Sequence, residues 1–170
     1  MQTAKEIAQY IICVSDLVGA EPVTPLRLQK LLYFCQAVHL KRHNQPLFNE
    51  DFVRWDYGPV IKDIYNDYKK YERNVIDVER QLDSFNLTRD EESTVIDTLR
   101  AFNDDSTAKL VNITHDKSSP WNYGEANTII SKNSIKDMPM RKVLTTDQIV
   151  DSLEVDGYTD QNGYLILGAE

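Results

Sequence analysis

The chain has 170 residues, of which 41% are hydrophobic and 27% are charged, and its formal net charge is −8. These values are ordinary for a folded protein with one sizeable core. The acidic balance argues against a non-specific nucleic-acid binder, because contacts to phosphate need clustered lysine and arginine side chains. We therefore expect no direct binding of nucleic acid.

The N-terminal sequence and the cysteines indicate the compartment. Residues 1–10 lack the unbroken apolar core and small-residue cleavage site of a signal peptide. The only two cysteines, Cys13 and Cys35, each fall within an apolar run and make no disulfide framework. We expect a cytoplasmic protein with free buried thiols and no membrane segment.

The first predicted element is an amphipathic helix over residues 4–18. Thr3 and Glu6 have the spacing of a capping box, and apolar residues then recur at helical spacing until Gly19. This helix has one apolar face, so it must pack against another element.

The second element organises the rest of the chain. Thr24 and Pro25 form a helix start, and neither glycine nor further proline interrupts the run until Pro46. Apolar residues cover most of the circumference, and Gln29, Gln36 and His43 leave only a thin polar seam. A helix that is apolar nearly all round is buried by its neighbours. We predict a mainly α fold, a compact helical domain around a buried central helix at about residues 25–44.

A short extended element is predicted near residues 52–57, because apolar and polar residues alternate there. Gly58 and Pro59 then suit a turn into a third helix, from Pro59 to about Glu72. Its tyrosines recur at helical spacing, so we expect this stripe to pack on the central helix.

Caps and apolar spacing predict further short elements downstream. They are a helix from Thr88 with Glu91 in its capping box, a helix over 107–115, a single turn at Pro120, a helix around Met138 capped by Ser134, a helix from Thr146, and either a C-terminal hairpin at Asn162-Gly163 or an extended tail. We divide the chain into a helical domain over residues 1–130 and an acidic extension over residues 131–170.

Three short motifs stand out in order along the chain. The first is LQKLLYF at residues 28–34, the second is WDYGPV at residues 55–60, and the third places Thr114-His115 shortly before Pro120-Trp121. We expect His115 to hold the loop that follows it by hydrogen bonds, with Trp121 as the anchor. The motif residues are Leu28, Gln29, Lys30, Leu31, Leu32, Tyr33, Phe34, Tyr57, Gly58, Pro59, Thr114, His115, Pro120 and Trp121.

Together these motifs resemble the Panacea antitoxin domain, also called the SocA-like or GepA-like phage-associated domain. The resemblance implies a mostly helical domain with a small extended element. It also implies an antitoxin, of phage or prophage association, that neutralises a toxin encoded beside it by direct protein–protein contact. In the SocA-like branch it implies a proteolytic adaptor that delivers the toxin to a bacterial AAA+ protease. No catalytic residue and no cofactor is implied.

Candidate partner-binding residues come from two places. Trp55 and Tyr57 lie in the second motif, and the chain after Thr145 carries acidic residues without lysine or arginine. Such a segment is commonly a solvated tail, but apolar anchors within it also suit an acidic arm that binds a basic toxin. The candidates there are Asp147, Asp151, Glu154, Tyr158 and Tyr164.

Two alternatives compete with an antitoxin. His39 and His43 are four residues apart on the central helix, so their rings could share a metal ion in a small hydrolase. A third ligand would have to come from His115, Glu50 or Asp51, and two histidines near a helix C-terminus are also favourable without any metal. The other alternative is an acidic mimic of DNA, which needs its acidic residues arrayed on one rigid face.

Overall fold

The computed structural model describes residues 1–79, 84–139, 157–159 and 165–167. The fold is mainly α with a small antiparallel sheet, which confirms the predicted fold class. The α-helices are α1 (Ala4–Val14), α2 (Pro25–His43), α3 (Lys62–Tyr68), α4 (Arg89–Ala101), α5 (Thr107–Thr114) and α6 (Lys132–Asp137). The short 3₁₀ segments are η1 (Asp16–Val18), η2 (Lys69–Tyr71) and η4 (Pro120–Asn122). The strands are β1 (Phe52–Trp55), β2 (Gly58–Val60), β3 (Ile129–Ile130), β4 (Gly157–Thr159) and β5 (Leu165–Leu167).

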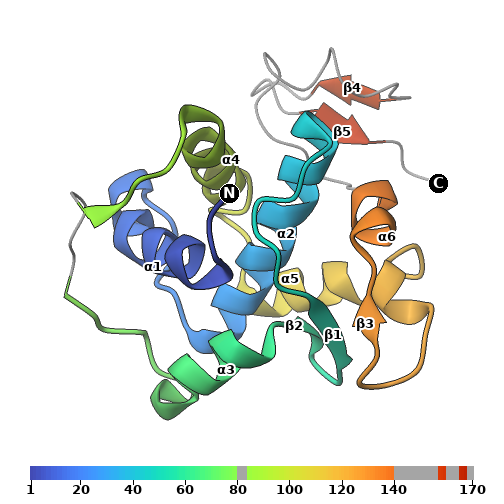
Figure 1. Cartoon of the computed structure of the whole chain (residues 1–170), viewed down its shortest axis with the longest axis horizontal. Helices are drawn as coiled ribbons and strands as arrows, with labels where there is room; N and C mark the ends of the chain where they lie inside the picture. The colour runs from blue at the N-terminus through green and yellow to red at the C-terminus, as the bar shows by residue number, and fades with distance from the viewer. Residues whose placement is uncertain (80–83, 140–156, 160–164, 168–170) are drawn as a thin grey trace.

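Helix α2 forms the centre of the molecule (Figure 1). It contacts α1, α3, α4, α5, α6 and β2, and every residue from Arg27 to Leu40 is buried. The Thr24 hydroxyl accepts a hydrogen bond from the Arg27 N–H at 3.3 Å, and Asn44 ends the helix in the left-handed conformation with φ 54°. The predicted central helix is therefore confirmed, within one residue at its end.

Two glutamines of the predicted polar seam fix extended segments against α2. The Gln36 amide accepts from the Leu47 N–H at 2.8 Å and donates to the Phe48 carbonyl at 2.9 Å. The Gln29 amide accepts from the Ile61 N–H at 2.9 Å and donates to the Ile61 carbonyl at 3.1 Å. Backbone groups that lie outside regular structure are thus satisfied in the interior by side chains of the central helix.

The predicted helix start at Pro59 is wrong, because Pro59 belongs to strand β2. The sheet order is β2-β1-β3, and Trp55 pairs with Gly58 across a tight antiparallel turn. Proline is tolerated because β2 is an edge strand and need not donate a hydrogen bond outward. The Gln29 amide then holds Ile61 extended, so α3 begins only at Lys62.

The tyrosine stripe divides between the core and the surface. Tyr68 is buried and Tyr71 packs at the edge of the core, as predicted, but Tyr65 is 42% exposed. Tyr65 instead meets Trp55 edge-to-face, with ring centroids 4.9 Å apart.

Capping residues set the ends of the other helices. Both predicted capping boxes are present, at the starts of α1 and α4. The first helix breaks at Ser15 into η1, which ends at Gly19 with φ 71°. Helix α6 is capped by Ser131 rather than Ser134, and it ends before Met138 because Pro139 disfavours the helical conformation of the preceding residue.

At the C-terminal end, β4 and β5 pair antiparallel, as the hairpin hypothesis requires. The helix predicted from Thr146 and the Asn162-Gly163 turn lie outside the described residues. Among the described residues, no helix is long and apolar enough to cross a bilayer.

We predict that Gln36→Leu lowers the free energy of unfolding by about 2–4 kcal/mol. The substitution leaves the Leu47 N–H and the Phe48 carbonyl buried without partners, and each such loss costs ~1–3 kcal/mol. Urea denaturation followed by circular dichroism measures the change. Gln9→Leu, on the exposed face of α1, is the matched control and should stay within about 0.5 kcal/mol of the parent.

Candidate functional site

The three sequence motifs meet around the buried side chain of Lys30. This residue of α2 is 0% exposed, and its Nζ donates a hydrogen bond to the Pro59 carbonyl at 3.0 Å. Gly58 has φ 101°, and a Cβ atom there would lie 2.6 Å from Lys30 Nζ and 2.7 Å from Thr114 Oγ1. Only glycine therefore allows the second motif to approach the first and the third so closely.

Burial lowers the pKa of Lys30 to about 7, because the charged ammonium loses its hydration. Among the residues that the structure describes, no carboxylate forms an ion pair with it. Its hydrogen bond to Pro59 crosses from the central helix to the edge strand of the sheet. We therefore interpret Lys30 as an internal link between motifs and not as a surface nucleophile.

The third motif holds the β1–β2 turn from the other side. His115 Nε2 lies 3.0 Å from the Asp56 carbonyl oxygen, and its Nδ1 lies 2.7 Å from the Val111 carbonyl oxygen. Trp121 Nε1 donates to the Trp55 carbonyl at 2.9 Å. The centroids of the Trp121 and His115 rings lie 4.0 Å apart, edge-to-face. His115 thus secures the turn across the fold as well as its own loop, whose Asn122 amide donates to the His115 carbonyl at 3.0 Å.

Arg54 is a structural cation that the sequence analysis missed. From strand β1 it donates to carbonyl oxygens of Pro120 (3.0 Å), Tyr123 (2.9 Å) and Ile129 (2.7 Å). A Cβ on Gly124 would lie only 2.6 Å from its guanidinium carbon. An arginine inside an otherwise apolar strand was the available signal, because a buried guanidinium needs several acceptors.

We give the name aromatic tip to four aromatic residues on and around the β1–β2 turn. Trp55 and Tyr57 belong to the turn, the ring of Tyr65 meets that of Trp55, and the carbonyl of Tyr123 accepts from Arg54. Tyr57 is 71% exposed and Tyr123 is 70% exposed, and the Tyr123 hydroxyl donates to the Lys117 carbonyl at 2.7 Å. Trp55 is partly buried against Tyr65. Large aromatic side chains in water, on a backbone fixed from several sides, are typical of a binding surface.

Only some of the predicted partner-binding residues lie in the part of the chain that the structure describes. Trp55 and Tyr57 lie in the aromatic tip, and Tyr158 belongs to strand β4. Asp147, Asp151, Glu154 and Tyr164 lie outside the described residues. Their role in binding stays a prediction.

The two histidines of the metal hypothesis lie together, with ring centroids 4.5 Å apart. His39 is buried and its Nδ1 lies 2.9 Å from the Thr94 hydroxyl, while burial, followed by the neighbouring His43, lowers its pKa to about 4. Within the described ranges no three His, Cys, Asp or Glu side chains are placed to hold a metal ion. Two of the suggested third ligands have other partners: Glu50 accepts from the Ala4 N–H, and Asp51 pairs with Lys132.

The family model described as "Antitoxin SocA-like, Panacea domain" matches residues 28–122, which is more than half of the chain, and the chain belongs to this family. The matched range contains all three motifs. No curated protein and no solved structure matches the chain.

We predict that Lys30 makes stability depend on pH. The folded state releases this proton near pH 7, whereas the unfolded chain keeps it up to the ordinary lysine pKa of 10.5. Between these values the unfolded state binds more protons, so the contribution of Lys30 to the free energy of unfolding rises with pH, by up to ~1.4 kcal/mol per unit. Urea unfolding at about pH 7, 8 and 9 measures the slope.

Lys30→Met should lose this part of the slope, because it has no proton to release. Lys117→Met is the matched control, since Lys117 is exposed and its side chain should leave the slope unchanged. Equal slopes for the parent and Lys30→Met would contradict the assignment.

Proposed function

We propose that this protein is the antitoxin of a toxin–antitoxin pair and neutralises its cognate toxin by direct protein–protein contact. Membership of the SocA-like Panacea family supports an antitoxin role. The observation that carries the contact is the aromatic tip, in which the exposed Tyr57 stands on a turn held by His115, Trp121 and Lys30. In this proposal the protein acts by binding and not by catalysis.

The tip fits a binding role for an energetic reason. Tyrosine and tryptophan dominate the energy of many protein interfaces, because each buries a large area while fixing few torsions. The backbone beneath Tyr57 is already fixed by hydrogen bonds to its neighbours Asp56 and Trp55. Little ordering is then left to occur on binding, which favours affinity.

Charge supports the choice of partner. The net charge of −8 would speed the encounter with a basic toxin. The acidic segment with Asp147, Asp151 and Glu154 and the tyrosines Tyr158 and Tyr164 extends the proposed contact surface. We further propose that the toxin is encoded beside this protein and that the bound toxin is presented to a bacterial AAA+ protease.

Co-expression tests the central proposal. The neighbouring open reading frame, expressed alone from an inducible promoter, should stop growth, and this protein should restore it. Tyr57→Ala and Tyr123→Ala should each weaken the complex by about 1–2 kcal/mol, roughly tenfold in dissociation constant, because each removes a large exposed contact. Growth rescue and calorimetric titration are the measurements.

Leu17→Ala is the matched control, because Leu17 is also an exposed large apolar residue, at 63%, but lies on η1. It should leave rescue and affinity unchanged. A neighbouring product that is harmless alone, or that stays lethal beside folded antitoxin, would refute the antitoxin proposal. Equal losses for all three variants would refute only the role of the tip.

The adaptor role has a separate readout. If the protein delivers the toxin for degradation, the half-life of the toxin should fall when both are present, and deletion of the responsible AAA+ protease should restore it. Neutralisation with an unchanged toxin half-life would leave binding in place and remove the adaptor role.

A further inference from the structure

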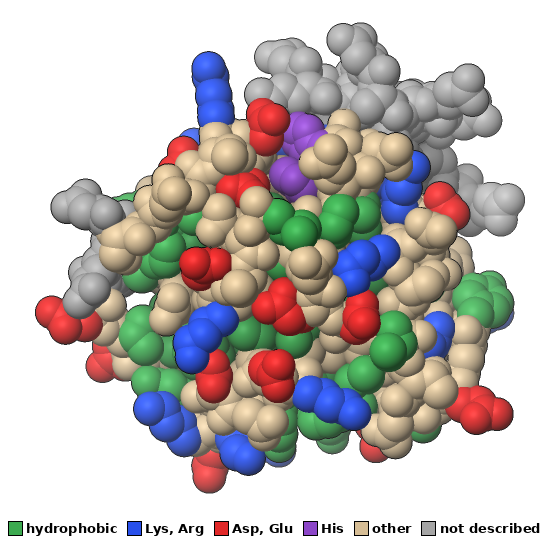
Figure 2. Space-filling view, viewed as in Figure 1, with side chains coloured by type: hydrophobic (Ala, Val, Ile, Leu, Met, Phe, Trp, Pro, Cys, Tyr) green, Lys and Arg blue, Asp and Glu red, His purple; other side chains and the backbone are tan. Residues whose placement is uncertain are grey.

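A further polar site lies where the C-terminal end of α2 packs against α4. His39 and His43 are four residues apart on α2, and their ring centroids lie 4.5 Å apart. Figure 2 shows histidine side chains, in purple, at the surface of the face viewed, and the His43 side chain is 30% exposed. His43 lies about 20 Å along α2 from Lys30, because each helical residue adds ~1.5 Å, so the pair is separate from the site around Lys30.

Helix α4 fixes which nitrogen of His39 carries the proton. The Thr94 hydroxyl donates its one hydrogen to the Asp90 carbonyl at 2.8 Å. The Thr94 oxygen can therefore only accept from His39 Nδ1, which lies 2.9 Å away. The neutral His39 ring then has its hydrogen on Nδ1 and a lone pair on Nε2. Among the described residues, none forms a hydrogen bond with that Nε2.

The His43 ring is directed by the same face of α4. Its Nδ1 lies 3.9 Å from a carboxylate oxygen of Asp90, which can only accept, so the hydrogen of a neutral His43 ring is favoured on Nδ1. Its Nε2 is buried and has no hydrogen-bond partner in the part of the chain that the structure describes. Asp90 and Thr94 are four residues apart on α4, which matches the spacing of the two histidines. Both Nδ1 atoms thus face α4, and both Nε2 atoms face away from it.

Two such Nε2 lone pairs, one turn apart on a helix, suit a transition-metal ion. Imidazole nitrogen is a favoured ligand of Zn²⁺, and side chains at i and i+4 lie close enough to share one ion. A ligating histidine commonly donates its other ring N–H to an oxygen, and here Thr94 and Asp90 offer those oxygens. A buried nitrogen without a hydrogen-bond partner, as His43 Nε2 is, also calls for an ion or a water molecule.

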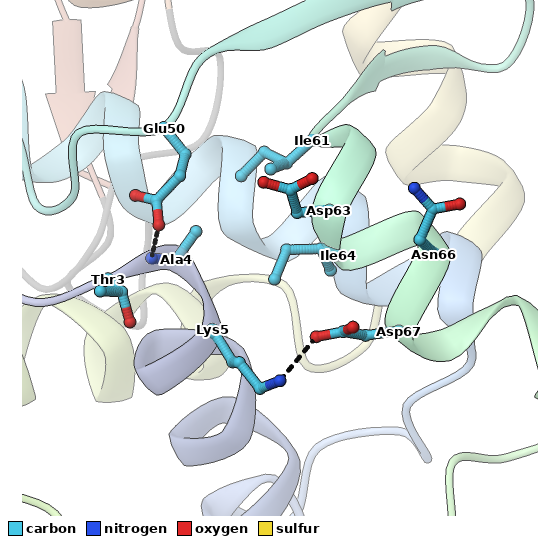
Figure 3. A pocket seen from close by; sticks show the side chains of 9 residues that line it. All are labelled: Thr3, Ala4, Lys5, Glu50, Ile61, Asp63, Ile64, Asn66 and Asp67. Carbon is cyan, nitrogen blue, oxygen red and sulfur yellow. Dashed lines mark hydrogen bonds and ion pairs between the residues drawn. The ribbon is translucent and has the colours of Figure 1, made fainter.

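The protein supplies two ligands and not three. Within the described ranges no third His, Cys, Asp or Glu side chain is placed to join the two histidines. Figure 3 shows Glu50 directed instead to the start of α1, where it accepts from the Ala4 N–H at 3.0 Å. The remaining coordination positions of an ion at this site are therefore left to water.

We propose that His39 and His43 bind a Zn²⁺ ion through their two Nε2 atoms, with water in the remaining positions. The ion clamps the last turn of α2 and, through the rings that Thr94 and Asp90 hold, its contact with α4. Because the site exists only in the folded chain, the ion stabilises the fold by mass action. None of these residues belongs to the aromatic tip, so the site is independent of the proposed toxin contact.

The test uses zinc chloride and the untagged full chain, freed of metal with a chelator. Calorimetric titration should give one ion per chain and a dissociation constant in the micromolar range. The melting temperature should rise with zinc concentration, whereas magnesium, which prefers oxygen ligands, should leave it unchanged. In long-range ¹H–¹⁵N spectra, zinc should shift the Nε2 signals of His39 and His43. The signals of His115, whose ring nitrogens both face carbonyl oxygens, should stay in place.

His43→Gln should lower the zinc affinity by at least about a hundredfold, because it removes one of the two ligands. Asp90→Ala should lower it by about tenfold, because the His43 ring loses the acceptor that directs it. Glu92→Ala is the matched control, since Glu92 is also an exposed acidic residue in the first turn of α4, and it should leave the affinity unchanged. Circular dichroism without zinc verifies that each variant keeps the fold.

Three results would overturn the proposal. They are equal zinc affinity of His43→Gln and the parent, an unshifted His39 signal at saturating zinc, and a stoichiometry of one ion per two chains, which would place the ion between copies. Since no toxin is present, these results are independent of the co-expression test.

Discussion

Burial of the central helix on all sides is the constraint on which the rest of the structure depends. A helix that no face exposes to water must find partners inside the protein for every polar group it carries. Gln29, Lys30 and Gln36 do so by binding the backbone of the segments around them. Ile61 and Leu47 lie outside regular structure and Pro59 lies on an edge strand, so side chains of α2 supply hydrogen bonds that these segments do not make among themselves.

The buried arginines likewise bind the backbone of the segments around them. Arg27 donates to the Phe102 and Asp105 carbonyls at 3.1 and 2.7 Å, which fixes the turn between α4 and α5. Arg54 does the same for the loop after α5. Arg27 also forms an ion pair with Glu21 at 3.3 Å, whereas Arg54 is held by carbonyl and hydroxyl oxygens, over which its several N–H donors spread its charge. Loops of this protein are thus held from inside by cations.

These hydrogen bonds from the interior also fix the backbone of the proposed binding surface. Trp55 and Tyr57 of the aromatic tip belong to a turn that Lys30 of α2, His115 at the end of α5 and Trp121 of η4 each hold through a separate hydrogen bond. A backbone held in this way has little left to order, so the proposed association would lose little conformational entropy. The family motifs lie mainly beneath this surface. Most of their residues are buried and give the tip its support.

The sequence by itself determined the helices with strong local signals. Capping residues and apolar spacing predicted α1, α2 and α4, and the unbroken apolar circumference of α2 identified it as the buried centre. Motif resemblance also found the residues around Lys30. Local signals were enough here because caps and periodicity act within a few residues along the chain.

Only the tertiary structure decided the rest. Pro59 entered a strand because the Gln29 amide and the strand β1 hold that segment extended, and both lie far from it in sequence or across a turn. Strand β3 exists because β1 offers its free edge to Ile130, and Arg54 became structural because the loop over residues 120–129 folds back on it. The aromatic tip likewise adds Tyr65 and Tyr123, which lie outside the second motif, to Trp55 and Tyr57. Long-range partners set the conformation wherever local preferences are weak. The helical framework could therefore be predicted from the sequence, whereas only the fold grouped the residues of the proposed binding surface.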